Sequence, residues 1–170
     1  MMVGLTGTPG TGKTSVAAEL ERRGYMIVHL LDTVQPYILE EDRARQTMVV
    51  DTDRWVEEFE HVDGIIEGHL AHLLPCDLVV VLRCRPDVLR RRLEQRGYPE
   101  AKIAENVEAE ALDVILIETL EEHPYEHVME VDTTDLSIEG CAWVVERFIR
   151  GELPPSCGSI DWTDYLENWV

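Results

Sequence analysis

Residues 7–14 read GTPGTGKT and match the phosphate-loop pattern G-x-x-x-x-G-K-[ST] at every fixed position. The glycines allow backbone conformations that a Cβ hinders, so several N–H groups can point into one concavity. Lys13 supplies a cation for the β- and γ-phosphates of a nucleotide, and the Thr14 hydroxyl is a ligand for Mg²⁺. The pattern therefore predicts a site for a polyphosphate.

The residues on either side of this loop support the same interpretation. Residues 2–5 are typical of a short buried strand, and residues 13–23 place Val16, Ala17 and Leu20 on one face of a helix. A helix that follows the loop adds the positive end of its dipole. We therefore expect ATP and Mg²⁺ to bind here. The predicted ATP contacts within the loop are Gly10, Gly12, Lys13, Thr14 and Ser15.

The rest of the chain alternates apolar runs with helical patterns, which is typical of βαβ units and an α/β fold with a parallel sheet. The predicted strands are residues 2–5, 25–30, 64–67, 77–83 and 127–131. The predicted helices are residues 13–23, 32–40, 53–60, 86–97, 99–123 and 137–150. Residues 48–50 are too few to assign. Residues 153–170 form a tail with aromatic side chains that either packs on the domain or docks on a partner.

The length of 170 residues fits one domain, and 45% apolar and 29% charged residues are ordinary for a globular protein. No apolar run approaches the roughly 20 residues that span a bilayer, and the first residues do not resemble a secretory signal. We therefore expect a cytoplasmic protein without a membrane partner. The four cysteines form no C-x-x-C pair, so packed, reduced thiols are expected rather than a metal or redox site.

The formal charge of −19 arises from 34 acidic and 15 basic residues, with Lys13 and Lys102 as the two lysines. Such a field repels the phosphates of nucleic acids and attracts basic partners. Direct RNA binding through a broad basic face is therefore not expected, whereas a basic protein partner is. The alternative is that the charge serves solubility alone or adaptation to a salty cytosol.

An acidic group on the Mg²⁺ side is expected at the end of a strand beside the loop. The segment GIIEGH places Glu67 at the end of an apolar run, where its carboxylate would hold Mg²⁺ through water. Asp32 and Asp51 are alternatives near other strand ends. His69 would orient a water or a phosphate, unless it is only a surface histidine. His69 and His72 are not expected to form a metal pair, because no matching ligand cluster accompanies them.

Further patterns narrow the class of phosphate-loop protein. The sequence lacks the N/T-K-x-D motif of guanine-specific proteins and an LSGGQ-like transporter signature, which favours a small-molecule kinase. Phosphoryl transfer needs positive charge around the γ-phosphate, and arginines cluster in PDVLRRRLEQRG. Arg92 and Arg96 share a helix face just before Gly97, a predicted hinge into a short lid. Arg83 ends a strand and is expected at the same edge of the sheet. For each arginine the alternative is a surface ion pair.

Several segments together resemble a known family: LTGTPGTGKT, VVDTDRWVEE, GIIEGH and VVVLRCRPDVLRRRLEQRGYPEAKIAENVEAEAL. In this combination, residues 1 to about 150 resemble the adenylate kinase isoenzyme 6 family, also called the coilin-interacting nuclear ATPase family, in what looks like its archaeal form. The phosphate loop is shared by many families, whereas the segment RLEQRGYPEAKIAEN is much more specific.

The resemblance implies a three-layer P-loop nucleoside monophosphate kinase fold over residues 1–152, with a five-stranded parallel sheet. It places a monophosphate-binding region at about 28–51 and a short lid at about 97–107. Family members transfer the terminal phosphate between ATP and a nucleoside monophosphate, and they also hydrolyse ATP; AMP is the monophosphate expected here. They act in late small ribosomal subunit maturation and rRNA processing, and they bind a basic small-subunit ribosomal protein.

These observations assign roles to particular side chains. The predicted catalytic residues are Lys13, Glu67, His69 and Arg96. Arg92 and Arg96 are predicted to contact ATP from outside the loop, and Thr14 and Glu67 are predicted to hold Mg²⁺.

The chain also departs from the family pattern. Eukaryotic members usually carry Asp-x-His where this chain has Glu67-Gly68-His69. Ordinary adenylate kinases have an arginine soon after the second and third strands, but LLDTVQPY and EGHLAHLL contain none. The candidates that remain for the monophosphate are Arg43, Arg45 and Arg54. A ribosome-assembly ATPase with little kinase activity is therefore a rival interpretation, and a small kinase of the dephospho-coenzyme A or shikimate type is a third.

Overall fold

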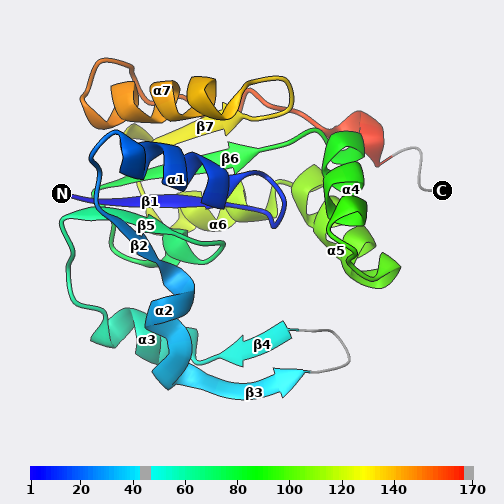
Figure 1. Cartoon of the computed structure of the whole chain (residues 1–170), viewed down its shortest axis with the longest axis horizontal. Coiled ribbons are helices and arrows are strands. Elements are labelled where there is room, and N and C mark those ends of the chain that lie inside the picture. The colour runs from blue at the N-terminus through cyan, green and yellow to red at the C-terminus, as the bar shows by residue number, and fades with distance from the viewer. Residues whose placement is uncertain (43–46, 167–170) are drawn as a thin grey trace.

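The computed structural model describes residues 1–42 and 47–166, and its core is a five-stranded sheet (Figure 1). All neighbouring strands pair in parallel, in the order β2-β5-β1-β6-β7. The strands are β1 Met2–Gly7, β2 Ile27–His29, β5 Gly64–Glu67, β6 Leu78–Arg83 and β7 Val128–Asp132. The predicted α/β fold with a five-stranded parallel sheet is confirmed, because the apolar runs identified in the sequence are the runs that the sheet buries.

Helices cover both faces of the sheet and make three layers (Figure 1). On one face α1, Lys13–Arg22, and α7, Ile138–Ile149, share a buried cluster with the sheet, to which Leu20 and Phe148 belong. The cluster on the other face includes side chains of three further helices. These helices are α2 Leu30–Val34, α3 Thr52–Glu58 and α6 Val114–Glu122.

The other two α-helices of the described residues stand beside the phosphate loop (Figure 1). They form a buried cluster of their own. Helix α4 covers Pro86–Gln95 and begins with proline at its first position, and α5 covers Glu100–Ala111. Their apolar sides meet in a buried cluster with Leu89 and Leu93 from α4. Gly97 makes the turn between them with a φ of 72°, a conformation that favours glycine.

The predicted helix over residues 32–40 is wrong. Helix α2 ends at Val34, a 3₁₀ turn follows at Gln35–Tyr37, and the chain continues as strand β3, Ile38–Asp42. Pro36 explains the early end of the helix, because proline has no N–H with which to continue the intrahelical hydrogen bonds.

Strand β3 is completed by strand β4, Thr47–Val50, which pairs with it in antiparallel fashion. Residues 48–50, too short to assign from sequence, are therefore a strand because a partner pairs with them. The hairpin stands apart from the main sheet, beyond α2 and α3 (Figure 1). Arg43 and Arg45, predicted as candidate contacts for the monophosphate, lie outside the described residues.

The predicted single helix over residues 99–123 is also wrong, because the chain breaks between α5 and α6. Asp113 takes a left-handed conformation with a φ of 57°, which ends the run of helical residues. Arg83 holds this break: its Nη2 donates to the Glu110 carbonyl at 3.2 Å and forms an ion pair with the Asp113 carboxylate. A side chain from strand β6 thus stabilises a turn that the local sequence does not favour.

The first part of the C-terminal tail packs on the domain, as one of the two alternatives predicted. Leu153 contacts the core, and the Glu130 N–H on β7 donates to the Ser156 carbonyl at 2.8 Å. Trp162 and Tyr165 make an edge-to-face contact with a centroid distance of 6.3 Å.

Two other expectations concern cysteines and membranes. All four cysteines are free thiols; three are buried, as expected for packed thiols, and Cys157 is partly buried. Among the described residues, no helix is both long enough and apolar enough to cross a bilayer.

Candidate functional site

The phosphate loop connects the end of β1 to the start of α1. Gly10 and Gly12 have φ values of 93° and 107°, which only glycine adopts readily. The Gly12 carbonyl accepts from the Val16 N–H at 3.0 Å and so begins the helix. A Cβ placed on Gly10 would lie 2.9 Å from carbons of Leu89 and Leu93. The loop is therefore shaped both by its own glycines and by the close approach of α4.

Replacing Gly10 by alanine is expected to lower the free energy of unfolding by about 2–4 kcal/mol, because the change combines backbone strain with overpacking. Gly24 provides a matched control, since its φ is 96° and a Cβ there would meet nothing within 4 Å. Gly24→Ala should cost only the conformational part, about 1–2 kcal/mol. Urea denaturation measures both, and equal losses would show that contact with α4 does not constrain the loop.

Lys13 is buried and folds back onto its own loop. Its Nζ donates to the Gly7 carbonyl at 2.8 Å and to the Thr8 carbonyl at 3.1 Å. Desolvation lowers the pKa of Lys13 from 10.5 to about 8; Glu67 opposes this shift, and the positive charge of Arg96 adds to it. Among the residues that the structure describes, no carboxylate is in direct contact with this ammonium, which lies beside the loop amides, where an anionic ligand would bind.

Glu67 lies where the sequence places it, at the end of β5 and next to the loop. Its Oε1 accepts from the Thr14 hydroxyl at 3.2 Å, and its Oε2 lies 3.0 Å from Nδ1 of His29. A hydroxyl and a largely buried carboxylate side by side are the oxygen donors that Mg²⁺ prefers. The residues therefore fit a magnesium site.

The two histidines near Glu67 have different surroundings. Although His69 is exposed, desolvation of its ring lowers the pKa of His69 to about 4, and the Lys13 charge contributes. The lowered pKa favours a neutral imidazole at pH 7, which can orient a water. His72 is fully buried between Thr6, 3.1 Å from its Nδ1, and Glu118, 2.9 Å from its Nε2. Its contacts are those of a packed core histidine.

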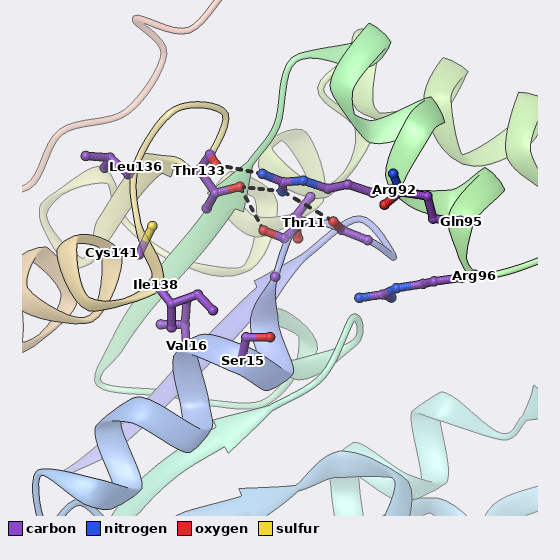
Figure 2. A pocket seen from close by; sticks show the side chains of 12 residues that line it. Thr11, Ser15, Val16, Arg92, Gln95, Arg96, Thr133, Leu136, Ile138 and Cys141 are labelled. Atoms are coloured by element: carbon purple, nitrogen blue, oxygen red, sulfur yellow. Dashed lines mark hydrogen bonds between the residues drawn. The ribbon is translucent and has the colours of Figure 1, made fainter.

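Arg92 and Arg96 lie on one side of a cavity of about 370 Å³ beside the loop (Figure 2). Arg92 crosses the loop and is fixed there: its Nη2 donates to the Thr133 carbonyl at 2.9 Å and its Nη1 to the Thr133 hydroxyl at 3.2 Å. Ser15, one of the predicted ATP contacts, also lines this cavity. The apolar part of the lining is supplied by Val16, Leu136, Ile138 and Cys141.

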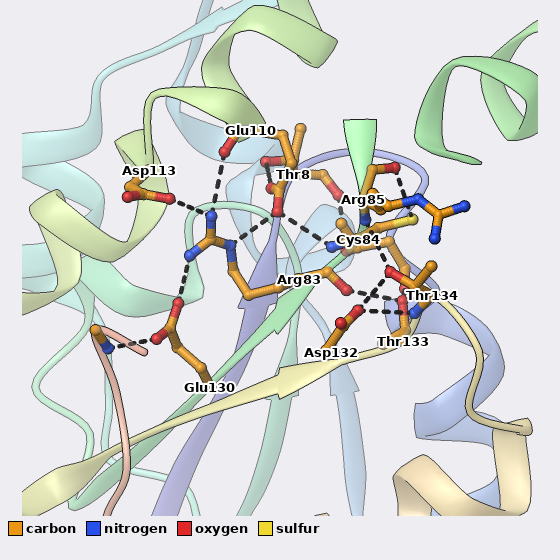
Figure 3. A network of polar contacts seen from close by, with 12 residues as sticks. Thr8, Arg83, Cys84, Arg85, Glu110, Asp113, Glu130, Asp132, Thr133 and Thr134 are labelled. Atoms are coloured by element: carbon orange, nitrogen blue, oxygen red, sulfur yellow. Dashed lines mark hydrogen bonds and ion pairs between the residues drawn. The ribbon is translucent and has the colours of Figure 1, made fainter. Parts of the chain in front are cut away.

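Arg83 ends strand β6 at the same edge of the sheet as the phosphate loop, as predicted. Its side chain neither lines the cavity nor lies at the surface, so the alternative of a surface ion pair is wrong. It is 1% exposed and forms ion pairs with Glu110, Asp113 and Glu130 (Figure 3). Burial acts to lower the pKa of Arg83, but the carboxylates outweigh this and raise it. Burial also raises the pKa of Glu130, which Arg83 opposes. Arg83 therefore ties strand β6 to helix α5 and to β7.

Sequence reasoning missed Glu110, which links this network to the phosphate loop. Its Oε2 accepts from the Thr8 hydroxyl at 2.6 Å, and its Oε1 accepts from Arg83 at 2.8 Å and from the Cys84 N–H at 3.1 Å. His29 and Thr133 were missed as well. No motif spacing marks any of these residues, because each one is brought to the site by packing between segments that are far apart in the sequence. The signal that the sequence did offer was the position of Glu110 on the apolar face of a helix.

The other candidates contact different groups. Arg54 donates through Nε to Glu58 Oε1 at 2.8 Å and lies over the ring of Tyr37, so its contacts are those of a surface ion pair. Asp51 caps helix α3 by accepting from the Arg54 N–H at 3.2 Å. Among the described residues, neither side chain hydrogen-bonds to Thr14 or Glu67.

Comparison with known proteins places this geometry in a family. The AAA domain family matches residues 3–113, which include the loop, Glu67 and the arginines of α4. The "Putative adenylate kinase" of Natronomonas pharaonis is 46% identical over 169 residues, covering 98% of this chain and 100% of that protein. The "Putative adenylate kinase" of Archaeoglobus fulgidus is 44% identical, covering 100% of this chain and 96% of that protein.

Solved structures share the fold at low sequence identity. The deoxyadenosine kinase of M. mycoides with bound dATP has a TM-score of 0.58 at 16% identity, covering 88% of this chain and 100% of that chain. The shikimate kinase of Bacteroides thetaiotaomicron has a TM-score of 0.57 at 19% identity, covering 88% and 98%. These likenesses confirm a P-loop kinase fold and nothing finer. With the phosphate loop, the AAA domain match and relatives above 40% identity over nearly its whole length, the chain belongs to the family of archaeal proteins named as adenylate kinases.

Proposed function

We propose that this protein is a Mg²⁺-dependent nucleoside monophosphate kinase that transfers the γ-phosphoryl group of ATP to AMP and also hydrolyses ATP. The observation that supports the proposal is the grouping of Lys13, the Thr14–Glu67 pair and the Arg92–Arg96 cavity around one glycine loop. Phosphoryl transfer depends mainly on positioning and on charge stabilisation, and these groups supply both.

The cavity suits the adenine of ATP. Its apolar lining would receive a flat base. The edge of the Arg92 guanidinium donates hydrogen bonds to Thr133, which leaves a face of the guanidinium for stacking on the base. A ligand placed there would extend its phosphates toward the Gly10 and Gly12 amides. We therefore assign the donor nucleotide to this side of the loop.

On the phosphate side, Lys13 would exchange its contacts with the loop carbonyls for the β- and γ-phosphates. Arg96 lines the cavity and, among the described residues, has no carboxylate within ion-pair distance, so it can stabilise the transferred charge. Thr14 and Glu67 would hold Mg²⁺, directly and through water, and the ion would neutralise charge on the phosphates. His69, neutral at pH 7, would orient a water when ATP is hydrolysed.

The acceptor is assigned to residues 28–51, with the segment 97–107 as lid. AMP is proposed because the relatives are named as adenylate kinases. Of the three arginines considered for binding the acceptor phosphate, Arg54 is already paired with Glu58. Arg43 and Arg45 remain proposals for the acceptor phosphate.

A coupled assay with ATP and each nucleoside monophosphate tests this function. We expect AMP to accelerate ADP formation well above the rate of ATP hydrolysis alone, and shikimate and dephospho-coenzyme A to have no effect. If no monophosphate raises the rate above hydrolysis, the kinase assignment is refuted. If shikimate or dephospho-coenzyme A does so instead, the third interpretation replaces it.

A second candidate is an ATPase that acts in late small-subunit maturation and rRNA processing by switching contact with a basic ribosomal protein. It is favoured by the charge of −19 and by the absence of arginines after the second and third core strands. Its test is capture of purified small-subunit ribosomal proteins on the immobilised chain with and without ATP. Capture that does not depend on nucleotide would count against the switch. RNA is not expected to bind directly, and cytoplasmic location stays a prediction.

A further inference from the structure

His29 stands at the junction between the core sheet and the region assigned to the acceptor. It is the last residue of β2, it pairs in register with Glu67 on β5, and helix α2 starts at the next residue. Its side chain is 51% exposed, whereas that of Glu67 is 10% exposed. No motif marked His29, and its side chain does not cap α2. Among the described residues, its side-chain hydrogen bond is with Glu67.

The contact divides the two oxygens of Glu67 between two partners. Thr14 donates to Oε1 at 3.2 Å, and Nδ1 of His29 lies 3.0 Å from Oε2. A carboxylate only accepts, so Nδ1 carries the proton in this contact. A glutamate side chain has several rotatable bonds and loses considerable freedom when it is ordered. One anchor would leave the carboxylate plane free to turn, whereas two anchors on different oxygens fix it.

We propose that His29 is a positioning residue for the magnesium site: its Nδ1–H fixes Glu67 so that Oε1 stays turned toward Thr14 and the phosphate loop. The proposal rests on the proposed function, because that function gives Glu67 its role. Groups that hydrogen-bond to a metal-binding side chain fix its orientation, and their removal commonly lowers metal affinity by about 10–100-fold. Glu67 acts through water, so we place the effect of His29 at the low end of that range.

The test measures how much Mg²⁺ strengthens ATP binding, by calorimetric titration with saturating Mg²⁺ and with a chelator. His29→Ala should reduce this Mg²⁺-dependent gain by about tenfold and leave binding of metal-free ATP unchanged. In steady-state kinetics, kcat should fall while KM for AMP does not change. His127→Ala, at an exposed histidine of the turn Tyr125–His127, is the matched control and should behave as the wild type.

Two further variants separate the nitrogens of the ring. The Asn amide can occupy the position of Nδ1 and donate to Glu67, so His29→Asn should keep most of the gain. The longer Gln amide reaches the position of Nε2, so His29→Gln should behave as the alanine variant. If Gln restores the gain and Asn does not, His29 acts through Nε2 and the proposal is refuted.

The outcomes also separate this proposal from the function on which it rests. If the wild-type protein shows no Mg²⁺-dependent gain, the proposed function fails and the role of His29 fails with it. If the wild type shows the gain and His29→Ala keeps it in full, only the role of His29 is refuted. Thermal unfolding of each variant confirms that the fold is intact, since an exposed side chain should change the midpoint little.

Discussion

Replacing Lys13 by methionine is expected to make the ligand-free protein more stable and almost inactive. Burial lowers the pKa of Lys13 to about 8. At pH 7 the ammonium is therefore charged in both states, but its free energy is higher in the folded protein than in the unfolded chain. The shift corresponds to about 3 kcal/mol, less the hydrogen bonds to two loop carbonyls. We therefore expect a gain of about 1–3 kcal/mol in the free energy of unfolding, and a fall in kcat/KM on the order of 10²–10³-fold.

The pH dependence identifies the cause. Below pH 8 the lysine is protonated in both states and the cost is fully present. Between pH 8 and 10.5 the folded state loses the proton first, so the wild type gains stability with pH and the advantage of Lys13→Met shrinks. Urea denaturation across this range measures both proteins. Lys102→Met is the control, because Lys102 is only partly buried and lies over the Tyr98 ring at 4.8 Å. No stability gain for Lys13→Met would contradict the burial of a charge in the loop.

Replacing Arg83 by methionine should cause the largest loss of stability, about 3–5 kcal/mol at pH 7. The substitution leaves Glu110 and Glu130, each with a side chain 2% exposed, without their shared cation. Breaking a buried pair costs more than the pair contributes, because the remaining charges cannot be hydrated. Chemical denaturation at neutral pH measures the loss, and a loss below about 1 kcal/mol would contradict the network.

The defect should shrink in acid. Burial raises the pKa of Glu130 and Arg83 opposes the rise, so the pKa climbs further in the variant. The penalty is present above this raised pKa and is lost as the pH falls toward the ordinary value of about 4.5. A charge-neutral control combines Arg83→Met with Glu110→Gln and Glu130→Gln. It should recover part of the stability at pH 7, because no buried charge is then left unpaired.

The parts of the site that could be predicted from sequence are those in which neighbours along the chain suffice. The loop needs glycines at fixed spacing, followed by Lys13 and Thr14, and each requirement is local to the backbone. Glu67 was found because a carboxylate at the end of a buried run must emerge beside the loop when strands are parallel. Arg92 and Arg96 were found because they lie four positions apart in a predicted helix and so share one face.

The errors arose where a distant partner decides the local structure. Residues 38–42 and 47–50 form strands because they pair with each other, and neither run is long enough to be identified alone. The helix over residues 99–123 breaks because Arg83, a side chain of strand β6, binds the turn at Asp113. Glu110 reaches Thr8 across 102 residues of sequence, so no spacing could reveal that contact.

The sequence by itself determined the phosphate loop, the parallel α/β sheet and the edge at which the chemistry lies. Backbone sterics and the burial of apolar runs act over a few residues, and for that reason they can be predicted from the sequence. Only the tertiary structure decided which charged side chains form ion pairs within the protein and which line the cavity. That choice depends on distance and burial, since the buried Arg83 forms ion pairs with three carboxylates while Arg96 lies beside the loop.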